Sequence, residues 1–380
     1  MKPWPKVKLG EVLRHRKEFI TIDDLTTYRR PRVQLHVQGI VQRDEVPGAL
    51  IKTKMQQVCR AGEFLVAEID AKVGGFGIVP ESLDGSIVSS HYFLFIVDES
   101  KLDRRFLDFF IRTPAFREQV AAQGSTNYAA IRPAHVLDYE IPLPPLAEQQ
   151  RVVARIEELA AQIYEARTLR VEVAGDLNVM LASAHRQIAK DAPRRPLGEV
   201  APLSRRPVTV ELEKSYPQIA VRSFGRGTFH KPPLVGSEVT WEKPFLVKAG
   251  DILVSNIKAW EGALAVARAE DDGRVGSHRY LTCVPIKGVA TARFVCFHLL
   301  SPEGLYEVGE ASPGSADRNR TLGAKALMKI PIPVPEYPKQ LWFDSLCGEV
   351  DALKCLQAET AAELDALLPS ILNKVFKGEL

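Results

Sequence analysis

The chain has 380 residues, of which 46% are hydrophobic and 26% charged, and its formal net charge is +3. This length exceeds what one hydrophobic core usually organises, so we expect two or more domains. The longest apolar runs fall far short of the roughly 20 residues that a membrane-spanning helix needs. The composition therefore excludes a membrane partner and is typical of a soluble globular protein.

Residues 1–145 combine strands and helices without a regular alternation. The apolar runs FLVAEI, from Phe64, and HYFLFIVD, from His91, are typical of buried strands. The run RRFLDFFIRTPAFREQV at 104–120 has helical apolar spacing and a proline that bends or ends its first part. We therefore expect a mixed domain of the α+β class rather than a doubly wound sheet.

From residue 146 to about 190 the apolar residues recur at spacings of three and four, which indicates a coiled-coil helix. Pro145 precedes this run and Pro193 follows it, so one helix is expected within 146–193. Its expected seam consists of Val152, Ile156, Leu159, Ile163, Ala166, Leu169, Val173, Leu177, Met180 and Ala184.

The second half of the chain repeats the first. LGEV at 9–12 recurs at 197–200, AGEFLVAEIDA at 61–71 as AGDILVSNIKA at 249–259, VSSH at 88–91 as VGSH at 275–278, RFLDFFIRTP at 105–114 as RFVCFHLLSP at 293–302, and IPLP at 141–144 as IPIP at 330–333. The offset stays between 187 and 189 residues over these five colinear matches. The chain is therefore an internal duplication.

The duplication predicts a second mixed domain at 194–335 and a second long helix at 336–380. The seam of this helix is expected at Leu346, Val350, Leu353, Gln357, Thr360, Leu364, Leu367, Ile371 and Val375. Gly175 and Pro369 are expected to kink the two helices. A long helix with one apolar stripe cannot stand alone, so we expect antiparallel pairing within the chain about a pseudo-twofold axis. Pairing with a second copy of the chain is the alternative.

The charge is distributed unevenly among these segments. The balance of Lys and Arg over Asp and Glu is +2 in 1–145 and +6 in 194–335, against −1 in 146–193 and −4 in 336–380. A positive bias on the compact segments is compatible with contact to phosphates.

Motifs for catalysis are missing from the sequence. It contains no G-x-x-x-x-G-K-[ST] loop, no glycine-rich turn for a dinucleotide or S-adenosylmethionine, and no Asn/Asp-Pro-Pro-aromatic motif. Glu68, Asp70 and Lys72 resemble half of a nuclease metal site, but the second copy has Asn256 and Lys258 where the first has the two acids. Five cysteines without a Cys-x-x-Cys pair predict reduced thiols in a cytoplasm. We expect neither a catalytic residue nor a metal site.

The segment IPLPPLAEQQRVVARIEEL at 141–159 resembles the junction between recognition domain and conserved helix in the specificity subunits of type I restriction–modification systems. LLPSILNKVFKGEL at 367–380 is similar to the C-terminus of that family, and LGEV opens each recognition domain as it does there. The resemblance covers the whole chain in order. The second junction, IPIPVPEYPKQ, departs from it by lacking the Glu-Gln-Gln run.

This resemblance implies a non-catalytic subunit that reads bipartite double-stranded DNA, one half-site per domain. It also implies that the helices hold two methyltransferase subunits, which restriction and translocase subunits join. S-adenosylmethionine, ATP and Mg²⁺ would serve those partners, and this chain would bind no cofactor. The residues expected to contact a partner are Glu148, Gln149, Gln150 and Arg151.

Loops that differ between the copies are the expected reading elements, because a shared scaffold that reads different half-sites must differ where it touches bases. The predicted DNA contacts are Arg29, Arg30, Arg32, Gln34, Lys72, Asn127, Tyr128 and Arg132 in the first domain, and Arg222, Arg226, Asn256, Lys258, Trp260, Arg279, Arg318, Asn319 and Arg320 in the second. Two alternatives stay open. Trp260 could belong to the core, and the basic run of Arg29, Arg30 and Arg32 could be a solvated loop. His91 and His278 match between the copies, and we expect a structural role for them, with base contact as the alternative.

Two other functions stay open from the sequence. One is a restriction or modification enzyme with an unrecognised active site, which methylation or cleavage by the isolated chain would reveal. The other is a homodimeric coiled-coil scaffold without a DNA role, which would enrich no DNA motif.

Overall fold

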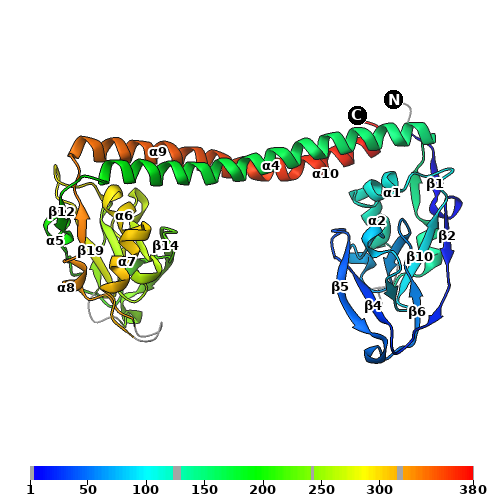
Figure 1. Cartoon of the computed structure of the whole chain (residues 1–380), viewed down its shortest axis with the longest axis horizontal. Coiled ribbons are helices and arrows are strands. Elements are labelled where there is room, and N and C mark those ends of the chain that lie inside the picture. Colours follow the sequence, from blue (N-terminus) through cyan, green and yellow to red (C-terminus); the bar gives the residue numbers. More distant parts are fainter. Residues whose placement is uncertain (1–3, 123–129, 241–243, 315–319, 380) are drawn as a thin grey trace. The chain divides into compact units, whose positions relative to one another are not determined.

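The computed structural model describes residues 4–122, 130–240, 244–314 and 320–379 (Figure 1). The chain divides into two compact units, Met1–Leu169 with Glu359–Leu380, and Arg170–Ala358. Each unit therefore combines a mixed domain with parts of both long helices. The boundaries predicted at 145, 193 and 335 divide the chain differently, since they separate each domain from its helix. They stay a prediction.

The domain of the first unit is built from short antiparallel sheets. They are β2 (Leu13–Arg16), β10 (Tyr92–Val97), β7 (Phe64–Ala67) and β8 (Phe76–Ile78) in that order, β3 (Ile20–Thr21) with β6 (Met55–Val58) and β9 (Ile87–Val88), the hairpin β4 (Thr27–Val33) and β5 (Ile40–Pro47), and β1 (Lys6–Lys8) with β11 (Glu140–Pro142). Its helices are α1 (Arg104–Ile111), α2 (Pro114–Ala122) and α3 (Pro133–Asp138), with 3-10 turns η1 (Leu9–Glu11), η2 (Gly48–Leu50), η3 (Ala71–Val73) and η4 (Glu81–Leu83). The expected buried strands and the helix broken before Pro114 are confirmed.

The domain of the second unit repeats this plan. Its strands are β16 (Ile252–Ser255) between β17 (Leu264–Val266) and β19 (Tyr280–Cys283), the sheet β14 (Thr228–Val235), β13 (Ser215–Val221), β18 (Val275–Gly276) and β15 (Phe245–Leu246), and β12 (Arg194–Pro196) with β20 (Pro331–Pro333). Its helices are α5 (Leu197–Val200), α6 (Ala292–Leu300), α7 (Pro302–Glu310) and α8 (Ala324–Leu327), with 3-10 turns η5 (Gly236–Glu238), η6 (Ala259–Glu261) and η7 (Ala269–Asp271). The α+β duplication is confirmed.

Two residue matches of the sequence comparison are in the wrong register. Strand β11 pairs Ile141 with Val7, and β20 pairs Ile332 with Arg195, so Ile141 corresponds to Ile332, not to Ile330. The error is two residues, one full period of a strand, and therefore leaves the apolar pattern intact.

The second error concerns the histidines. The amide of Glu68 donates to the carbonyl of His91, and the amide of Asn256 donates to that of Arg279. His91 therefore corresponds to Arg279, and its expected match with His278 is wrong by one residue.

The first long helix, α4, extends from Leu146 to Ala189 as predicted. The second is divided into α9 (Tyr337–Glu359) and α10 (Ala361–Lys377), with the break at Thr360. The helical assignment continues through Gly175 and Pro369, the two positions where kinks were expected. In the described part of the chain no helix is both long and apolar enough to cross a membrane.

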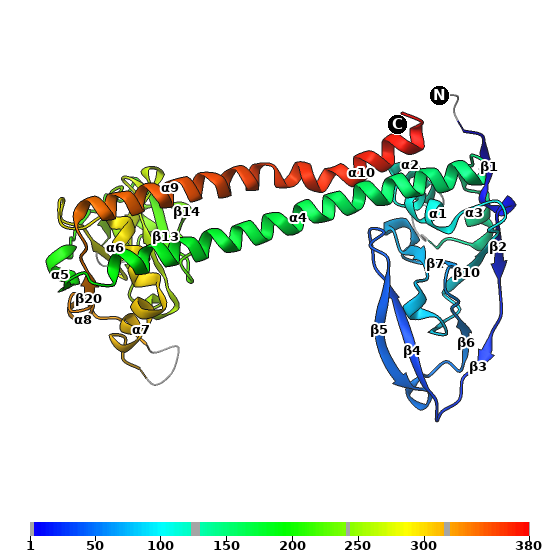
Figure 2. The ribbon, with the colours of Figure 1, turned by 45° about the horizontal axis from the view of Figure 1, so that its top comes forward.

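In the first unit, α10 runs antiparallel to the first part of α4 (Figures 1 and 2). Ile156 packs with Leu372 and Val375, and Arg167 forms an ion pair of 2.8 Å with Asp365. The same pair of helices contacts the domain, because the ring of Phe376 lies among those of Trp4, Phe106 and Phe110.

In the second unit, α9 runs antiparallel to the last part of α4. Leu181 packs with Phe343 and Cys347, and Lys354 donates to Asn178 across 2.7 Å. The expected intrachain antiparallel pairing is thus observed within each unit, although Met180, Leu353 and Leu367 of the expected seams are more than 40% exposed. Other expected seam residues, among them Ile156, Val350 and Val375, are buried, and each pair of helices also packs on α1 or α6 of its domain.

The aromatic contact between helix and domain differs in chemistry between the units. In the first unit Phe376 and Phe110 lie 5.2 Å apart between ring centroids. At the equivalent positions of the second unit stand His185 and His298, stacked at 5.5 Å and both buried. Burial lowers the pKa of each histidine to about 4, so both imidazoles are neutral at pH 7.

Candidate nucleic-acid interface

The tip of the β4–β5 hairpin docks on the turn η3. The amide of His36 donates to the carbonyl of Val73 across 2.7 Å, and that of Val37 donates to Gly74 across 3.0 Å. Gly74 has φ +84°, and a Cβ there would lie 2.8 Å from the amide nitrogen of Val37. Only glycine therefore permits this close approach of two backbone segments.

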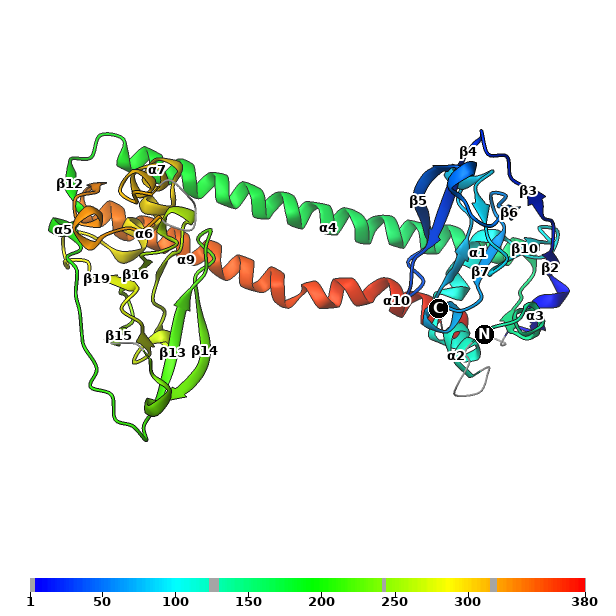
Figure 3. The same cartoon turned by 90° about the horizontal axis from the view of Figure 1, so that it is seen from below.

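The β13–β14 hairpin, seen in Figure 3, docks on η6 in the same way. The amide of Phe224 donates to the carbonyl of Glu261 across 2.8 Å, and that of Gly225 donates to Gly262 across 2.9 Å. Gly262 stands at the position equivalent to Gly74, and its φ of +75° is likewise in the region that favours glycine. The two domains therefore present one backbone framework, a hairpin tip fixed to a 3-10 turn.

In the first domain the side chains on this framework are mixed in charge. Glu68, which is 17% exposed, accepts from His91 across 2.8 Å and lies 3.8 Å from the predicted contact Arg132. The exposed Arg132 and the half-buried Lys72 thus lie on the framework with two acids, Glu68 and Asp70. The net charge of these four residues is therefore small.

In the second domain cations outnumber acids on the corresponding surface, although Lys258 forms an ion pair with Glu261. Lys258 and Arg320 lie 5.3 and 5.2 Å from the ring centroid of Trp260, a cation–π arrangement. Trp260 is half-buried rather than a core residue, and its indole nitrogen and the amide oxygen of Asn256 lack a hydrogen-bond partner among the described residues. The exposed Arg279 follows in the same loop cluster, since its carbonyl accepts from Asn256.

Two further predicted contacts flank this hairpin tip. The guanidinium of Arg222 lies 5.0 Å from the ring of Phe229, and that of Arg226 lies 5.7 Å from the ring of Phe224. Both arginines line a cavity of about 430 Å³ in the second unit together with Arg268, Arg293, Lys354 and Asp351. Cations thus predominate in this cavity.

In the basic run of the first domain, some arginine side chains are hydrogen-bonded within the domain and one is exposed. Arg30 forms two hydrogen bonds of 2.7 Å with Asp44, which lower the pKa of that carboxyl, and Arg29 donates to the carbonyls of Ser82 and Asp84. These bonds fix both guanidinium groups to the domain. Arg32 is exposed and Gln34 half-buried.

Four predicted contacts, Asn127, Tyr128, Arg318 and Asn319, lie outside the described residues. Two residues that the sequence did not single out, His36 and Phe224, occupy the centre of the two hairpin tips. Their signal in the sequence is weak, because a tip without an Asn-Gly or Asp-Gly pair is hard to place. In the part of the chain that the structure describes, no three His, Cys, Asp or Glu residues are grouped as metal ligands.

At the start of α4, Gln149 is fully buried and bonds within its own unit. Its side-chain oxygen accepts from the amide of Asp103 across 2.8 Å, and its side-chain nitrogen donates to the carbonyls of Lys101 and Pro144 across 2.8 and 2.9 Å. The prediction that Gln149 contacts a partner is therefore wrong, because nothing outside the unit can reach it.

Gln340 makes the same contacts at the start of α9. It accepts from the amide of Thr291 across 3.0 Å and donates to the carbonyls of Val289 and Pro335 across 2.9 and 2.8 Å. The second junction therefore also contains the buried glutamine. The sequence did not reveal it, because the two copies had been aligned two residues out of register at this junction.

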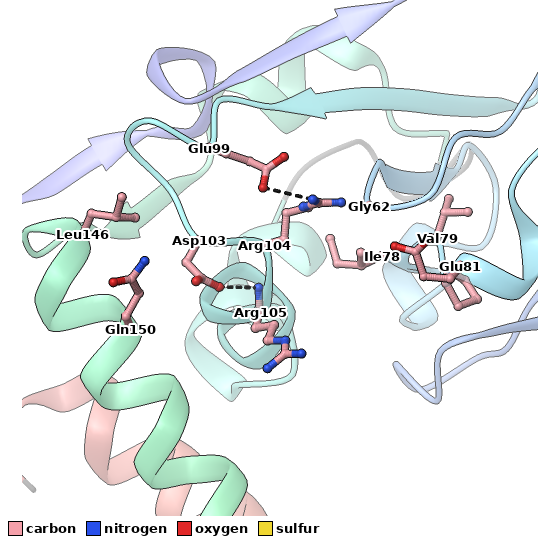
Figure 4. Close-up of a pocket in the computed structure, with 11 residues that line it drawn as sticks. Gly62, Ile78, Val79, Glu81, Glu99, Asp103, Arg104, Arg105, Leu146 and Gln150 are labelled. Carbon is pink, nitrogen blue, oxygen red and sulfur yellow. Dashed lines mark hydrogen bonds and ion pairs between the residues drawn. The ribbon is translucent and has the colours of Figure 1, made fainter.

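The other predicted partner residues stay accessible. Arg151 is exposed and its hydrogen bond lowers the pKa of Glu148, one turn away. Gln150 lines a pocket of about 470 Å³, drawn in Figure 4, together with Glu99 and Arg104, which form an ion pair of 3.0 Å. This pocket places the start of α4 beside the first turn of α1.

Two domains that share a backbone framework and differ in the side chains it carries are typical of a recognition protein rather than of a symmetric enzyme. Residues 1–173 match the model of a family described as type I restriction modification DNA specificity domain. The resemblance seen in the sequence is thereby confirmed for the first domain and the beginning of α4.

Solved structures share the fold over the whole chain. The HsdS subunit from Thermoanaerobacter tengcongensis is 24% identical with a TM-score of 0.66, over 100% of this chain and 98% of that chain. A chain from a structure described as the basis of complex assembly and conformational transition of the type I R-M system is also 24% identical, with a TM-score of 0.68, over 100% of this chain and 99% of that one. No curated protein matches the sequence. The fold of two mixed domains with long helices is therefore shared over the complete chain.

Proposed function

We propose that this chain is the non-catalytic specificity subunit of a type I restriction–modification complex and reads a bipartite DNA target. Each domain reads one half-site through its hairpin tip and 3-10 turn. The repeated docking of His36 on Val73 and of Phe224 on Glu261 carries the proposal. A repeated backbone with different side chains is what two readers of unlike half-sites require.

The charges of the two reading surfaces support unequal roles. Arg222, Arg226, Lys258 and Arg320 accompany the second tip with one acid, Glu261, which pairs with Lys258, whereas two acids, Glu68 and Asp70, accompany the first. Phosphate contacts supply much of the affinity of DNA-binding proteins. The second domain should therefore contribute more of the affinity for DNA.

Selection from a random duplex pool by the full-length chain tests this function. We expect two short conserved half-sites separated by a spacer of constant length and variable sequence. Substitutions in the two tips should each affect one half-site. A single continuous motif would contradict the bipartite reading, and the absence of any motif would contradict DNA recognition by this chain.

The helices are proposed to hold two methyltransferase subunits, which restriction and translocase subunits join in the cytoplasm. Large apolar side chains exposed on the helices support this, namely Tyr164 at 73%, Val179 at 68% and Trp342 at 53%. S-adenosylmethionine, ATP and Mg²⁺ would act in those partner subunits.

Co-purification with a modification subunit of the same system tests the scaffold role. Trp342→Glu, in α9, should weaken capture of that subunit at least tenfold. Arg151→Glu, in α4, should have the same effect at the junction of the first domain. Tyr306→Glu is the matched control, because Tyr306 is a 69% exposed aromatic side chain that belongs to α7 and not to a long helix. Equal capture by all variants would contradict docking on the helices, and methylation by the chain alone would contradict its non-catalytic role.

A further inference from the structure

An aromatic side chain stands in a strained conformation at the apex of each reading hairpin. Among the described residues, His36 has φ +59° and Phe224 has φ +62°, in the left-handed region that favours glycine. Both amides donate to the 3-10 turn of their domain, so the two residues are equivalent across the repeat. A left-handed conformation is unfavourable for a residue with a Cβ.

Phe224 obtains no compensating burial in exchange for this strain. Its side chain is 71% exposed, although the neighbouring Gly225 and Gly227 show that glycine is used freely in this tip. A buried phenylalanine would stabilise the fold through the hydrophobic effect, and an exposed one contributes little. The ring therefore gives the isolated domain no stability, and its use must lie in what it contacts outside.

The surroundings of Phe224 fit double-stranded DNA. Arg226 lies beside the ring, and Arg222 flanks the tip, so cations accompany the apolar side chain. Proteins that deform DNA combine an apolar wedge between bases with cations on the phosphates. A wedge also needs a rigid support, which the hydrogen bond of 2.8 Å from Phe224 to Glu261 supplies.

On the basis of the proposed function, we propose that Phe224 is a specificity-determining residue whose ring inserts against a base step of the half-site read by the second domain. His36 holds the equivalent place in the first domain, where an imidazole reads a base edge by hydrogen bonding instead. The difference in chemistry at one backbone position thus separates the two half-sites.

The substitution Phe224→Gly removes the ring and relieves the strain, so the variant should fold with an unchanged or higher melting temperature. In selections from a random duplex pool, Phe224→Gly should lose about tenfold of the base preference at one or two adjacent positions of one half-site. His36→Gly should do the same in the other half-site. Leu212→Ala is the matched control, because Leu212 is also 71% exposed but lies at the opposite end of the β13–β14 hairpin.

Fluorescence of 2-aminopurine at the affected step gives a second readout. Binding of the unmodified chain should unstack the probe and raise its emission severalfold, and Phe224→Gly should abolish the rise while DNA is still bound. Selection of the same motif by Phe224→Gly and the unmodified chain would overturn the inference while leaving the proposed function standing. If the unmodified chain selects no motif, the proposed function itself fails.

Discussion

Gln149 and Gln340 occupy equivalent positions 191 residues apart, and each joins the first turn of a long helix to its own domain through three hydrogen bonds. Each side chain is fully buried. A glutamine is suited to this place because its amide group accepts one bond and donates two. The pair therefore fixes how each helix leaves its domain.

Replacement of Gln149 by alanine should lower the free energy of unfolding by about 2–3 kcal/mol, because one amide and two carbonyl groups lose buried partners. Gln149→Glu should cost more, since a carboxylate cannot donate to the carbonyls. Denaturant unfolding of the full chain measures this. Gln150→Ala is the control, because Gln150 is exposed and should change stability little. Equal stability of the Gln149 and Gln150 variants would show that the buried bonds contribute nothing.

Acid should loosen the helix contact of the second unit before that of the first. His185 and His298 have a pKa of about 4 in the folded chain, below the ordinary 6.5, so the unfolded chain binds more protons between these values. Stability is then lost as the pH falls from about 6.5 toward 4, on the order of 3 kcal/mol for each histidine. The charge of Glu303 opposes this shift in both histidines, and the pKa of about 4 includes its effect.

The double variant His185→Phe and His298→Phe copies the pair Phe376 and Phe110 of the first unit and should remove this acid sensitivity. Hydrogen exchange in α6 relative to α1, corrected for its intrinsic pH dependence, reports the two contacts separately. Persistence of the acid-induced opening of α6 in the double variant would exclude the histidines as its cause.

Arg32 and Arg30 should differ in their effect on DNA binding. Arg32→Ala should reduce the slope of log affinity against log salt by about 0.9, the value for one lost phosphate contact. The double variant Arg30→Ala and Asp44→Ala keeps the net charge and should leave the slope unchanged, because the two side chains already neutralise each other. Salt titrations of DNA affinity decide this, and an unchanged slope for Arg32→Ala would remove Arg32 from the interface.

Gly74→Ala should destabilise the docking of the first hairpin more than Gly39→Ala does. Both glycines have positive φ, so both variants carry a strain of roughly 1 kcal/mol. A Cβ at Gly74 also meets the backbone of Val37 at 2.8 Å, whereas nothing lies within 4 Å of a Cβ at Gly39. Unfolding and DNA affinity should both respond to Gly74→Ala, and equal effects of the two variants would argue against a fixed tip.

The sequence by itself determined the duplication, the mixed domains and the long helices. These features rest on local patterns, because a helix repeats every 3.6 residues and a buried strand is a short apolar run. The start of α4 at Leu146 and the break between α1 and α2 follow from prolines that act on their immediate neighbours. The resemblance to specificity subunits rests on the same local segments.

Only the tertiary structure decided the register of the repeat and the use of individual side chains. A shift of two residues keeps every strand residue on the same face, so the pattern could not separate Ile330 from Ile332. Whether Arg30 is free depends on Asp44 across a hairpin, and whether Gln149 is accessible depends on Asp103, 46 residues earlier. Such partners come together only when the chain folds, because hydrogen bonds and close contacts depend on distances in space, which the order of residues does not express.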